Sequence, residues 1–599
     1  MRSRPLLTFI IVVVLLFGVG LGAKQLAAYS FSQYVNYVSP FTVPLDSSTA
    51  GPALAQRVIL IVIDGLRVDA FERMSLVDRY RPRASLWRAF TGEPSLSYPG
   101  WTTILSGAPP EISGVTTNWY TGAVKVDHLF AEAKRSGLPT AAVGHPGWGQ
   151  LFAASIDEFV PVPDPAYTDL PAIHDTSVTV TNAGVRFVQG PARFILLHYP
   201  APDLMGHGAG GVSQPYQDSV RLIDEELTRL LGGVDLSTTT VIITSDHGHI
   251  DQGGHGGWEP VVRTVPLMFL GAGIERGDGF DARQADIAPT IAALLGLPLP
   301  AHNIGRPLIE ALSTLPEGLD QRWGQQQAAF YEKVYSVAVL GRRFPVFTTP
   351  LGGPNPDALL AAADDLARQR AEWLNRGLAR DRARRFPLAL ILAVLPAGLF
   401  LLHRPRRDLL PALAGTAVFF GVALGLFYGR GYYFSLSIIN REDMLATFFE
   451  GRTVDAAIAV AAGALIAGWA ARRRGLWTGA LAGLSTAYLS ASVLLLLSLY
   501  YLALWGIRFP YYLPDLREGF RFYLTLLALL PVGLLAAPLV VVSLAGFGIG
   551  RLGERIFGRG RRGAPPPGAT RDIPSSVAAP ARRESAAPVS TGDSTQSRP

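Results

Sequence analysis

Six long apolar segments limit what this chain can fold into. The first, Leu6 to Ala23, is uncharged and follows Arg2 and Arg4. At about 1.5 Å per residue it crosses most of a bilayer's hydrocarbon, and we predict a signal anchor over residues 1–23. A cleaved signal peptide is the alternative, because small residues follow at Ala27 and Ala28; in both cases the next segment is exported. The other five segments lie in the second half of the chain: Pro387 to Leu402, Leu410 to Tyr428, Val454 to Ala471, Trp477 to Trp505 and Phe522 to Gly548.

Arginines between these segments predict the orientation of the chain. If the spans alternate, the clusters at Arg2, Arg404 to Arg407, Arg472 to Arg474 and Arg551 to Arg562 share one side, which the positive-inside rule assigns to the cytoplasm. We expect a multi-pass plasma-membrane protein with cytoplasmic termini, and the Ala, Arg and Gly content indicates a bacterial source. A further cluster, Arg376 to Arg385, falls outside and is interpreted as a solvated helix face or a contact with anionic headgroups. The net charge of +6 therefore reports membrane orientation and indicates no nucleic-acid partner.

Between the first and second apolar segments the pattern changes to short buried strands and turns. Val58 to Ile63, Arg193 to His198 and Thr239 to Thr244 are continuously apolar, which is typical of strands covered on both faces. We predict an α/β domain with a mostly parallel sheet between helices, followed by an all-α membrane domain, with about six transmembrane helices in total. Asn355 before Pro356 predicts a helix start. The expected boundaries are an anchor at 1–23, a linker at 24–55, the α/β domain at 56–310, a helical connector at 311–386, five membrane helices at 387–548 and a basic, disordered cytoplasmic tail at 549–599.

Polar residues that can bind metal follow the predicted strands. Asp64 ends the first strand, Asp203 and His207 are four residues apart, and a later segment reads Ser245-Asp-His-Gly-His249 and then Gly253-Gly-His-Gly-Gly257. The chain has 0 Cys, so thiolates are excluded as ligands and nucleophiles. Three aspartates and three histidines at the ends of strands are the ligand types for two borderline metal ions, and a hydroxyl between them would lose its proton readily.

The order of these motifs resembles the alkaline phosphatase superfamily. Within it, the sequence is similar to the type I phosphodiesterase/nucleotide pyrophosphatase group and to the GPI ethanolamine-phosphate transferases, over residues 56–310. The closing segments Ala285 to Thr290 and Asn303 to Arg306 belong to the same pattern. Three departures are Ser97 for a usual Thr, Gly100 for a usual Asn, and Ser113 for a common His.

The resemblance implies roles for individual residues. Two Zn²⁺ are expected, with Mn²⁺ as the alternative, and Ser97 would be the nucleophile of a phosphoserine mechanism. Asn118, 21 residues after Ser97, would donate to a non-bridging phosphoryl oxygen. His249 could contact substrate or donate a proton, or be a hydrated loop residue, and His198 could lie behind the ligands or in the core. One zinc would be held by Asp64, Ser97, Asp246 and His247, and the other by Asp203, His207 and His255.

The expected function is a membrane-bound phosphodiesterase or phosphotransferase acting on a phosphodiester or phospholipid-type substrate at the outer face of the bilayer. Hydrolysis and transfer to a lipid-linked acceptor both stay open, as does the oligomeric state. Two other activities are disfavoured. A sulfatase would need Arg in the segment Ser97 to Trp101, which has none. The cofactor-independent phosphoglycerate mutases are soluble manganese enzymes, which does not agree with six predicted membrane spans. An inactive transporter or scaffold is the remaining alternative, although the spans contain few ionisable groups, with Asp455 near an end, and show no midplane relay.

Overall fold

The computed structural model describes residues 4–346, 356–403 and 406–558. Asn355, the predicted helix cap, and the tail beyond residue 558 lie outside these ranges. The predicted tail begins too early, because helix α20 (Pro538–Gly558) continues past residue 549.

An eight-stranded mixed sheet forms the centre of the α/β domain, with the order β4-β3-β5-β1-β6-β7-β2-β8. The four pairs from β4 to β6 are parallel, β7 is antiparallel to both neighbours, and β2 pairs parallel with β8. The expected mostly parallel sheet between helices is confirmed. The strands are β1 (Arg57–Ile63), β2 (Ala84–Phe90), β3 (Thr140–Gly144), β4 (Glu158–Pro161), β5 (Phe194–Tyr199), β6 (Thr239–Thr244), β7 (Thr264–Gly271) and β8 (Gly277–Arg283).

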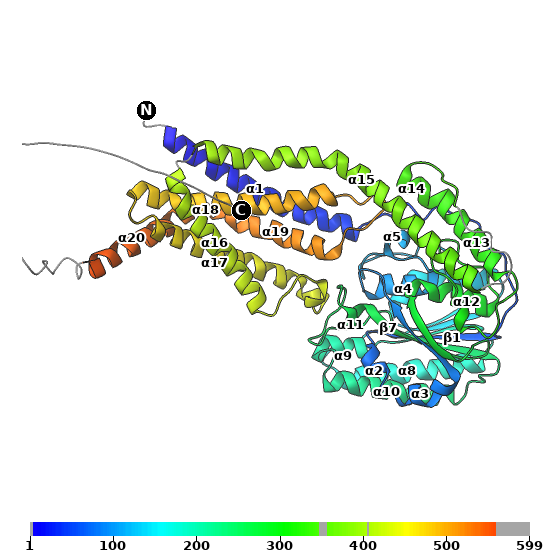
Figure 1. Ribbon diagram of the computed structural model, residues 1–599. Coiled ribbons are helices and arrows are strands. Elements are labelled where there is room, and N and C mark those ends of the chain that lie inside the picture. The colour runs from blue at the N-terminus through cyan, green and yellow to red at the C-terminus, as the bar shows by residue number, and fades with distance from the viewer. Residues whose placement is uncertain (1–3, 347–355, 404–405, 559–599) are drawn as a thin grey trace, which may run out of the picture. The chain divides into compact units, whose positions relative to one another are not determined.

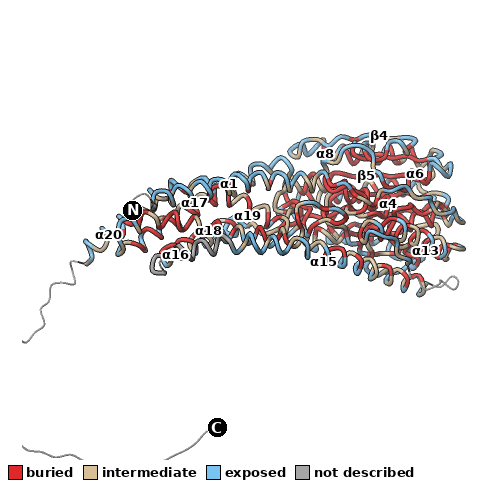
Figure 2. Tube along the Cα trace, turned by 90° about the horizontal axis from the view of Figure 1, so that it is seen from above, coloured by how far each residue is buried: buried red, intermediate tan, exposed pale blue. Residues whose placement is uncertain are grey.

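Helices cover both faces of this sheet (Figure 1). Strand β1 shows why its sequence is continuously apolar: Val58, Leu60 and Val62 enter one core, and the alternate residues Ile59 and Ile61 enter the other. Figure 2 shows the buried residues concentrated in this domain. The helices are α2 (Val68–Phe71), α3 (Ser75–Tyr80), α4 (Ser97–Ser106), α5 (Pro110–Ser113), α6 (Leu129–Arg135), α7 (Pro146–Phe152), α8 (Leu170–Gln189), α9 (Ala201–Ala209), α10 (Gln214–Leu231), α11 (Pro260–Arg263) and α12 (Ile287–Leu295).

The segment predicted as a connector, 311–386, packs against the α/β domain. It contains α13 (Leu319–Phe330), a π-helical turn (Tyr331–Tyr335), α14 (Ser336–Leu340) and most of α15 (Pro356–His403). Trp323, Phe330 and Trp373 are buried in the same core as Val58. The hydrophobic core of the domain therefore extends beyond residue 310.

The first helix is also longer than predicted. Helix α1 (Arg4–Val35) continues past Ala23, so part of the predicted linker is helical. Beyond it, Phe41 is fully buried and stacks on Tyr335 with 5.0 Å between the ring centroids. The segment after the anchor is thus partly helix and partly packed into the domain core.

Within the described residues, four helices are long and apolar enough to cross a membrane, or five if the bent pair α19 and α20 counts as one span. We predicted six. Part of the second predicted span, at the end of α15, lies outside the described side chains. The last predicted span bends by 75° between α19 and α20, with Pro531 and Pro538 on either side of the break. The remaining helices are α16 (Arg406–Gly429), α17 (Leu445–Ala470), α18 (Leu476–Leu504) and α19 (Leu516–Leu534).

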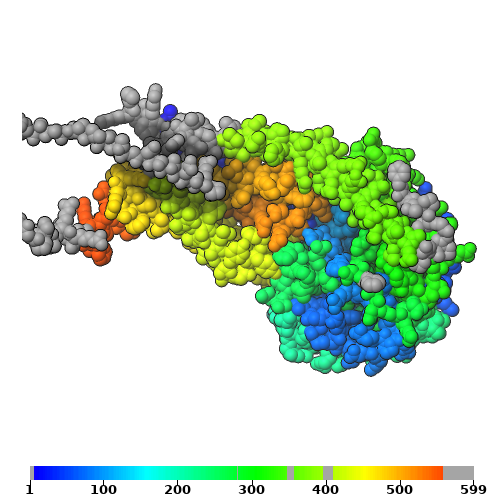
Figure 3. Space-filling view, viewed as in Figure 1, coloured from blue at the N-terminus to red at the C-terminus, as the bar shows by residue number. Residues whose placement is uncertain are grey.

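The α/β domain and these helices up to Gly550 belong to one compact unit. The loop between α16 and α17, residues 430–444, joins the two parts. Its residues Asn440, Ser437 and Phe434 accept hydrogen bonds from the α/β domain. On the face shown in Figure 3, the chain around this loop borders the α/β domain.

Candidate metal centre

The predicted ligands meet at one edge of the sheet. Asp64 follows β1, Asp246 follows β6, and Asp203 lies in the first turn of α9, just after β5. These three strands are neighbours and parallel, so their carboxyl ends deliver the carboxylates to the same place. Asp64 and Asp246 are 4% and 0% exposed.

The first cluster contains Asp64, Asp246 and His247, whose ligand atoms lie within 4.8 Å of one another. His247 Nε2 is 3.3 Å from Asp64 Oδ1 and 3.7 Å from Asp246 Oδ2. Ser97 Oγ is 3.4 Å from the same nitrogen. The structure therefore brings together all four residues predicted to hold one ion.

The second cluster is built around Asp203. Its carboxylate is 3.4 Å from His207 Nε2 and 3.6 Å from His255 Nε2. The two histidine nitrogens are themselves 3.2 Å apart. The rings of His247 and His255 stack with centroids 3.6 Å apart, so the two clusters adjoin.

The hydrogen bonds behind these histidines show that the residues fit a metal ion. The Nδ1 atoms of His255 and His247 face the backbone carbonyls of Ser95 and Gly248, at 2.9 and 3.3 Å. A carbonyl oxygen only accepts, so Nδ1 carries the proton in each ring and the Nε2 lone pair points into the site. Asp64 Oδ1 is buried and has no hydrogen-bond partner in the described part of the chain. Metal sites typically have histidines whose outer nitrogen donates to a carbonyl and whose inner lone pair faces the ion, together with carboxylate oxygens that are free to bind it.

His249 and His198 have the opposite tautomer. The Nδ1 atom of His249 accepts from the backbone N–H of Gly254 at 3.0 Å, so its Nε2–H donates to Asp203 Oδ1 at 2.8 Å. In the same way His198 accepts from the backbone of His145 and donates to Asp64 Oδ2 at 2.9 Å. His249 is 0% exposed, so its interpretation as a hydrated loop residue is wrong. Its ring could join a ligand group with Asp203 and His207 by distance, but its proton lies on the nitrogen that faces the site.

The charges of the site also fit a cation. Burial, then repulsion by Asp246 and Asp203, raises the pKa of Asp64 well above its usual range. Burial would also raise the pKa of Asp203, but His207 and His249 outweigh it and hold that pKa well below the usual range. Burial lowers the pKa of His249 to about 4, so this ring is neutral at pH 7. The repulsion that disfavours the charge on Asp64 is of the kind that a bound divalent cation would relieve.

Ser97 and Asn118 lie together at the beginning of α4. Ser97 is the first residue of the helix, where free backbone N–H groups favour an anion. The Oδ1 atom of Asn118 accepts from the backbone N–H of Tyr98 at 3.0 Å. This bond fixes the orientation of the amide, and leaves its N–H₂ group as the donor for another partner.

The loop 430–444 supplies residues that sequence reasoning missed. Asn440 Oδ1 accepts from Nδ1 of His207 at 3.0 Å, and Asn440 Nδ2 donates to the His207 carbonyl at 2.8 Å. Ser437 Oγ accepts from the Gly257 backbone at 3.0 Å and donates to Glu259 at 2.7 Å. Single polar residues in a loop that is 178 to 233 positions from their partners carry no signal in one sequence.

An apolar cavity of about 190 Å³ leads from the centre towards the apolar helices. His255 and Thr117 line it on the side of the metal centre. Phe449 of α17 and Phe522 of α19 line it on the other side. The cavity therefore connects the chemistry of the sheet edge with the part of the chain expected in the membrane.

Comparison with known proteins finds a family model that matches much of the α/β domain. Residues 58–256 match the family model "Type I phosphodiesterase / nucleotide pyrophosphatase". The resemblance predicted from the sequence is confirmed over these residues.

Two groups of curated proteins are similar to this chain. GPI ethanolamine phosphate transferase 1 of Homo sapiens is 27% identical over 328 residues, which cover 46% of this chain and 34% of that protein. A 2,3-bisphosphoglycerate-independent phosphoglycerate mutase of Microcystis aeruginosa is 32% identical over 179 residues, 27% of this chain and 33% of that enzyme. The chain thus spans about a third of the length of these relatives. Among solved structures, murine ectonucleotide pyrophosphatase/phosphodiesterase 5 aligns with a TM-score of 0.37 and 14% identity, over 43% of this chain and 100% of that one.

Proposed function

We propose that this protein is a membrane-bound, two-zinc phosphotransferase that moves a phosphoryl-linked headgroup from a lipid phosphodiester to a lipid-linked acceptor. The observation that carries this proposal is the apolar cavity between His255 and the helices α17 and α19. A soluble phosphodiester needs no such cavity, whereas a lipid substrate must bring apolar chains close to the nucleophile. The similarity to ethanolamine phosphate transferases supports the same conclusion.

The proposed reaction has two displacements at phosphorus. Ser97 Oγ forms a bond to phosphorus as the bond to the leaving lipid alcohol breaks, and the electron pair of that bond leaves with the alcohol oxygen. An acceptor hydroxyl then attacks the phosphoserine from the opposite side and releases Ser97. The Asn118 amide donates to a non-bridging phosphoryl oxygen in both steps.

The residues that would hold the metal have distinct tasks. Asp64, Asp246, His247 and Ser97 would bind one Zn²⁺, and Asp203, His207 and His255 the other. Bound zinc would stabilise the deprotonated hydroxyl and the negative charge on the phosphoryl oxygens. His198 and His249 keep the carboxylates of Asp64 and Asp203 in place through their Nε2–H bonds.

Two alternatives are decided by experiment. Hydrolysis differs from transfer only in the second attacking group, which would be water. An inactive transporter or scaffold would have no reason to keep seven predicted metal and nucleophile residues within contact of one another.

The test uses the full chain in liposomes that contain phosphatidylethanolamine with a radiolabelled headgroup and an extract of membrane lipids as acceptor. Transfer moves label into a new lipid, whereas hydrolysis releases water-soluble phosphoethanolamine. Ser97→Ala should abolish both products while metal content stays near the wild-type level, and Ser136→Ala, at an exposed helix end, should leave activity unchanged. Near-full activity in Ser97→Ala would refute the mechanism, and label only in the soluble fraction would replace transfer by hydrolysis.

A further inference from the structure

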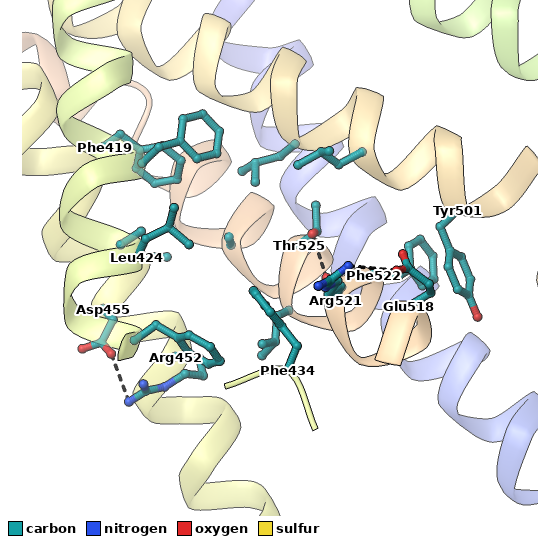
Figure 4. Close-up of a pocket in the computed structure, with 18 of the residues that line it drawn as sticks. Phe419, Leu424, Phe434, Arg452, Asp455, Tyr501, Glu518, Arg521, Phe522 and Thr525 are labelled. Atoms are coloured by element: carbon teal, nitrogen blue, oxygen red, sulfur yellow. Dashed lines mark hydrogen bonds and ion pairs between the residues drawn. The ribbon is translucent and has the colours of Figure 1, made fainter. Parts of the chain in front are cut away.

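A second cavity, of about 550 Å³, lies between the apolar helices α16, α17, α18 and α19. Its volume is within the range of about 300–1,000 Å³ that is typical of ligand pockets. Figure 4 shows that aromatic and aliphatic side chains, such as Phe419 and Leu424, share it with charged ones. None of these residues belongs to the metal centre.

The charged side chains that line this cavity form ion pairs. Asp455 is shared by two arginines, because Arg430 contacts its Oδ1 at 2.9 Å and Arg452 its Oδ2 at 3.0 Å. Arg521 pairs with Glu518 at 2.8 Å. Two guanidinium groups of the lining thus face two carboxylates, and Arg430, which is not part of the lining, adds a third, half-exposed guanidinium from outside it.

Arg452 has unused donors in this place. Its side chain is only 9% exposed and lies against Asp455 and the ring of Tyr432, and among the described residues its Nε and Nη1 atoms have no hydrogen-bond partner. A buried N–H group without an acceptor is costly, so the oxygen atoms of a bound anion would stabilise this side chain. Figure 4 shows Arg452 on α17 and Arg521 on α19, with Phe434 drawn between them.

The positions of the two arginines along their helices indicate the kind of anion that would bind. Arg452 is in the second turn of α17 and Arg521 in the second turn of α19, and both helices begin on the side of the loop 430–444 that contacts the metal centre. Apolar residues of α16 and α18, including Leu424 and Leu494, continue the wall away from the charges. A charged end and an apolar body match an amphiphile, whereas a free inorganic anion would gain nothing from the apolar wall.

We propose that this cavity binds one glycerophospholipid molecule, with its phosphodiester at Arg452 and Arg521 and an acyl chain along α16 and α18. The oxygen atoms of the phosphodiester would accept from the buried Nε and Nη1 donors of Arg452. The stacked rings of Tyr501 and Phe522, 4.2 Å apart, line both this cavity and the one that reaches His255. The bound lipid is therefore held beside the route to the metal centre without being part of it, and its binding does not depend on the proposed reaction.

The experiment uses the full chain with Ser97→Ala, so that turnover cannot consume the probe. The protein is placed in nanodiscs of phosphatidylcholine that contain a phosphatidylcholine with a diazirine on its acyl chain, and crosslinked peptides are mapped by mass spectrometry. We expect crosslinks on the α16 and α18 segments that line the cavity. Arg452→Gln combined with Arg521→Gln should reduce them at least tenfold, whereas Arg473→Gln, an exposed arginine just beyond α17, should not.

A second variant separates binding from folding. Ala423→Trp leaves all the charges in place and fills the apolar part of the cavity, and it should also reduce the crosslinks while elution from a size-exclusion column stays unchanged. Crosslinks that persist in both variants, or that fall equally on lipid-facing residues of every helix, would overturn the proposal. Displacement of the probe by inorganic phosphate alone would instead identify a free-anion site and would overturn it as well. A chain that shows these crosslinks but no transferase activity would refute the proposed function and leave the lipid site intact.

Discussion

Asn440 tests whether the loop 430–444 is part of the metal centre. The change Asn440→Ala removes both of its hydrogen bonds to His207, at 3.0 and 2.8 Å. The ring of His207 then loses the acceptor that keeps the proton on Nδ1 and the lone pair of Nε2 directed at Asp203. Loss of such a partner typically lowers metal affinity by about 10- to 100-fold, which corresponds to about 1.4–2.7 kcal/mol.

The assay is zinc content by mass spectrometry after dialysis of the full chain against a series of chelator concentrations. The midpoint of zinc loss should move to a chelator concentration about 10- to 100-fold lower in Asn440→Ala. Asn440→Asp keeps the acceptor for Nδ1 but lacks the donor to the His207 carbonyl, so its midpoint should fall between wild type and Asn440→Ala. Asn182→Ala, on the exposed face of α8, is the matched control. Equal midpoints for wild type and Asn440→Ala would show that Asn440 does not hold a ligand.

Three further predictions concern the α/β domain. Removing the N–H that His249 donates to Asp203, by His249→Ala, should lower metal affinity by about 10- to 100-fold in the same dialysis. Trp148 is 0% exposed and stacks on Trp101 at 4.5 Å, so Trp148→Ala should destabilise the fold by about 3–5 kcal/mol, seen as a lower denaturation midpoint. Burial, then Asp127, raises the pKa of Glu132 to about 8; a raised carboxyl pKa means that the contribution of Glu132 to stability falls as pH rises from the unfolded pKa through about 8, so the melting temperature of Glu132→Gln should rise relative to that of wild type between pH 5 and pH 9.

The sheet edge could be predicted because its physics is local. Continuous apolar runs predict strands covered on both faces, and parallel strands bring the residues after them to one edge. Asp64 and Asp246 follow two parallel neighbouring strands, β1 and β6, and therefore come together. The position of Asp203 was harder to predict, since it lies in the first turn of α9 and not directly after a strand. His207, four residues later, lies on the same face of that helix.

His249 and the segment after 310 show where this reasoning ends. Glycines around His249 suggest an exposed turn, yet the backbone N–H of Gly254 folds back onto its ring and buries it. The buried face of α13 and α15 is mixed with charged residues, so nothing in the composition distinguishes a packed helix from a connector. Trp323 and Trp373 become core residues only through the tertiary contacts of the domain.

The loop 430–444 gives the apolar helices a role beyond anchoring the α/β domain. A phosphodiesterase domain that acts on a soluble substrate needs only a tether, for which α1 alone would suffice. Here Asn440 holds His207, and Ser437 joins Gly257 to Glu259, so the chain between α16 and α17 contacts both a candidate metal ligand and the segment around His255. A shift of α16 against α17 would move Asn440 and reach the Nε2 atom of His207 through two hydrogen bonds. The helices are thereby coupled to the geometry of the candidate metal centre. A lipid bound in the proposed cavity would contact α16 and α17, the helices on either side of the loop that positions His207.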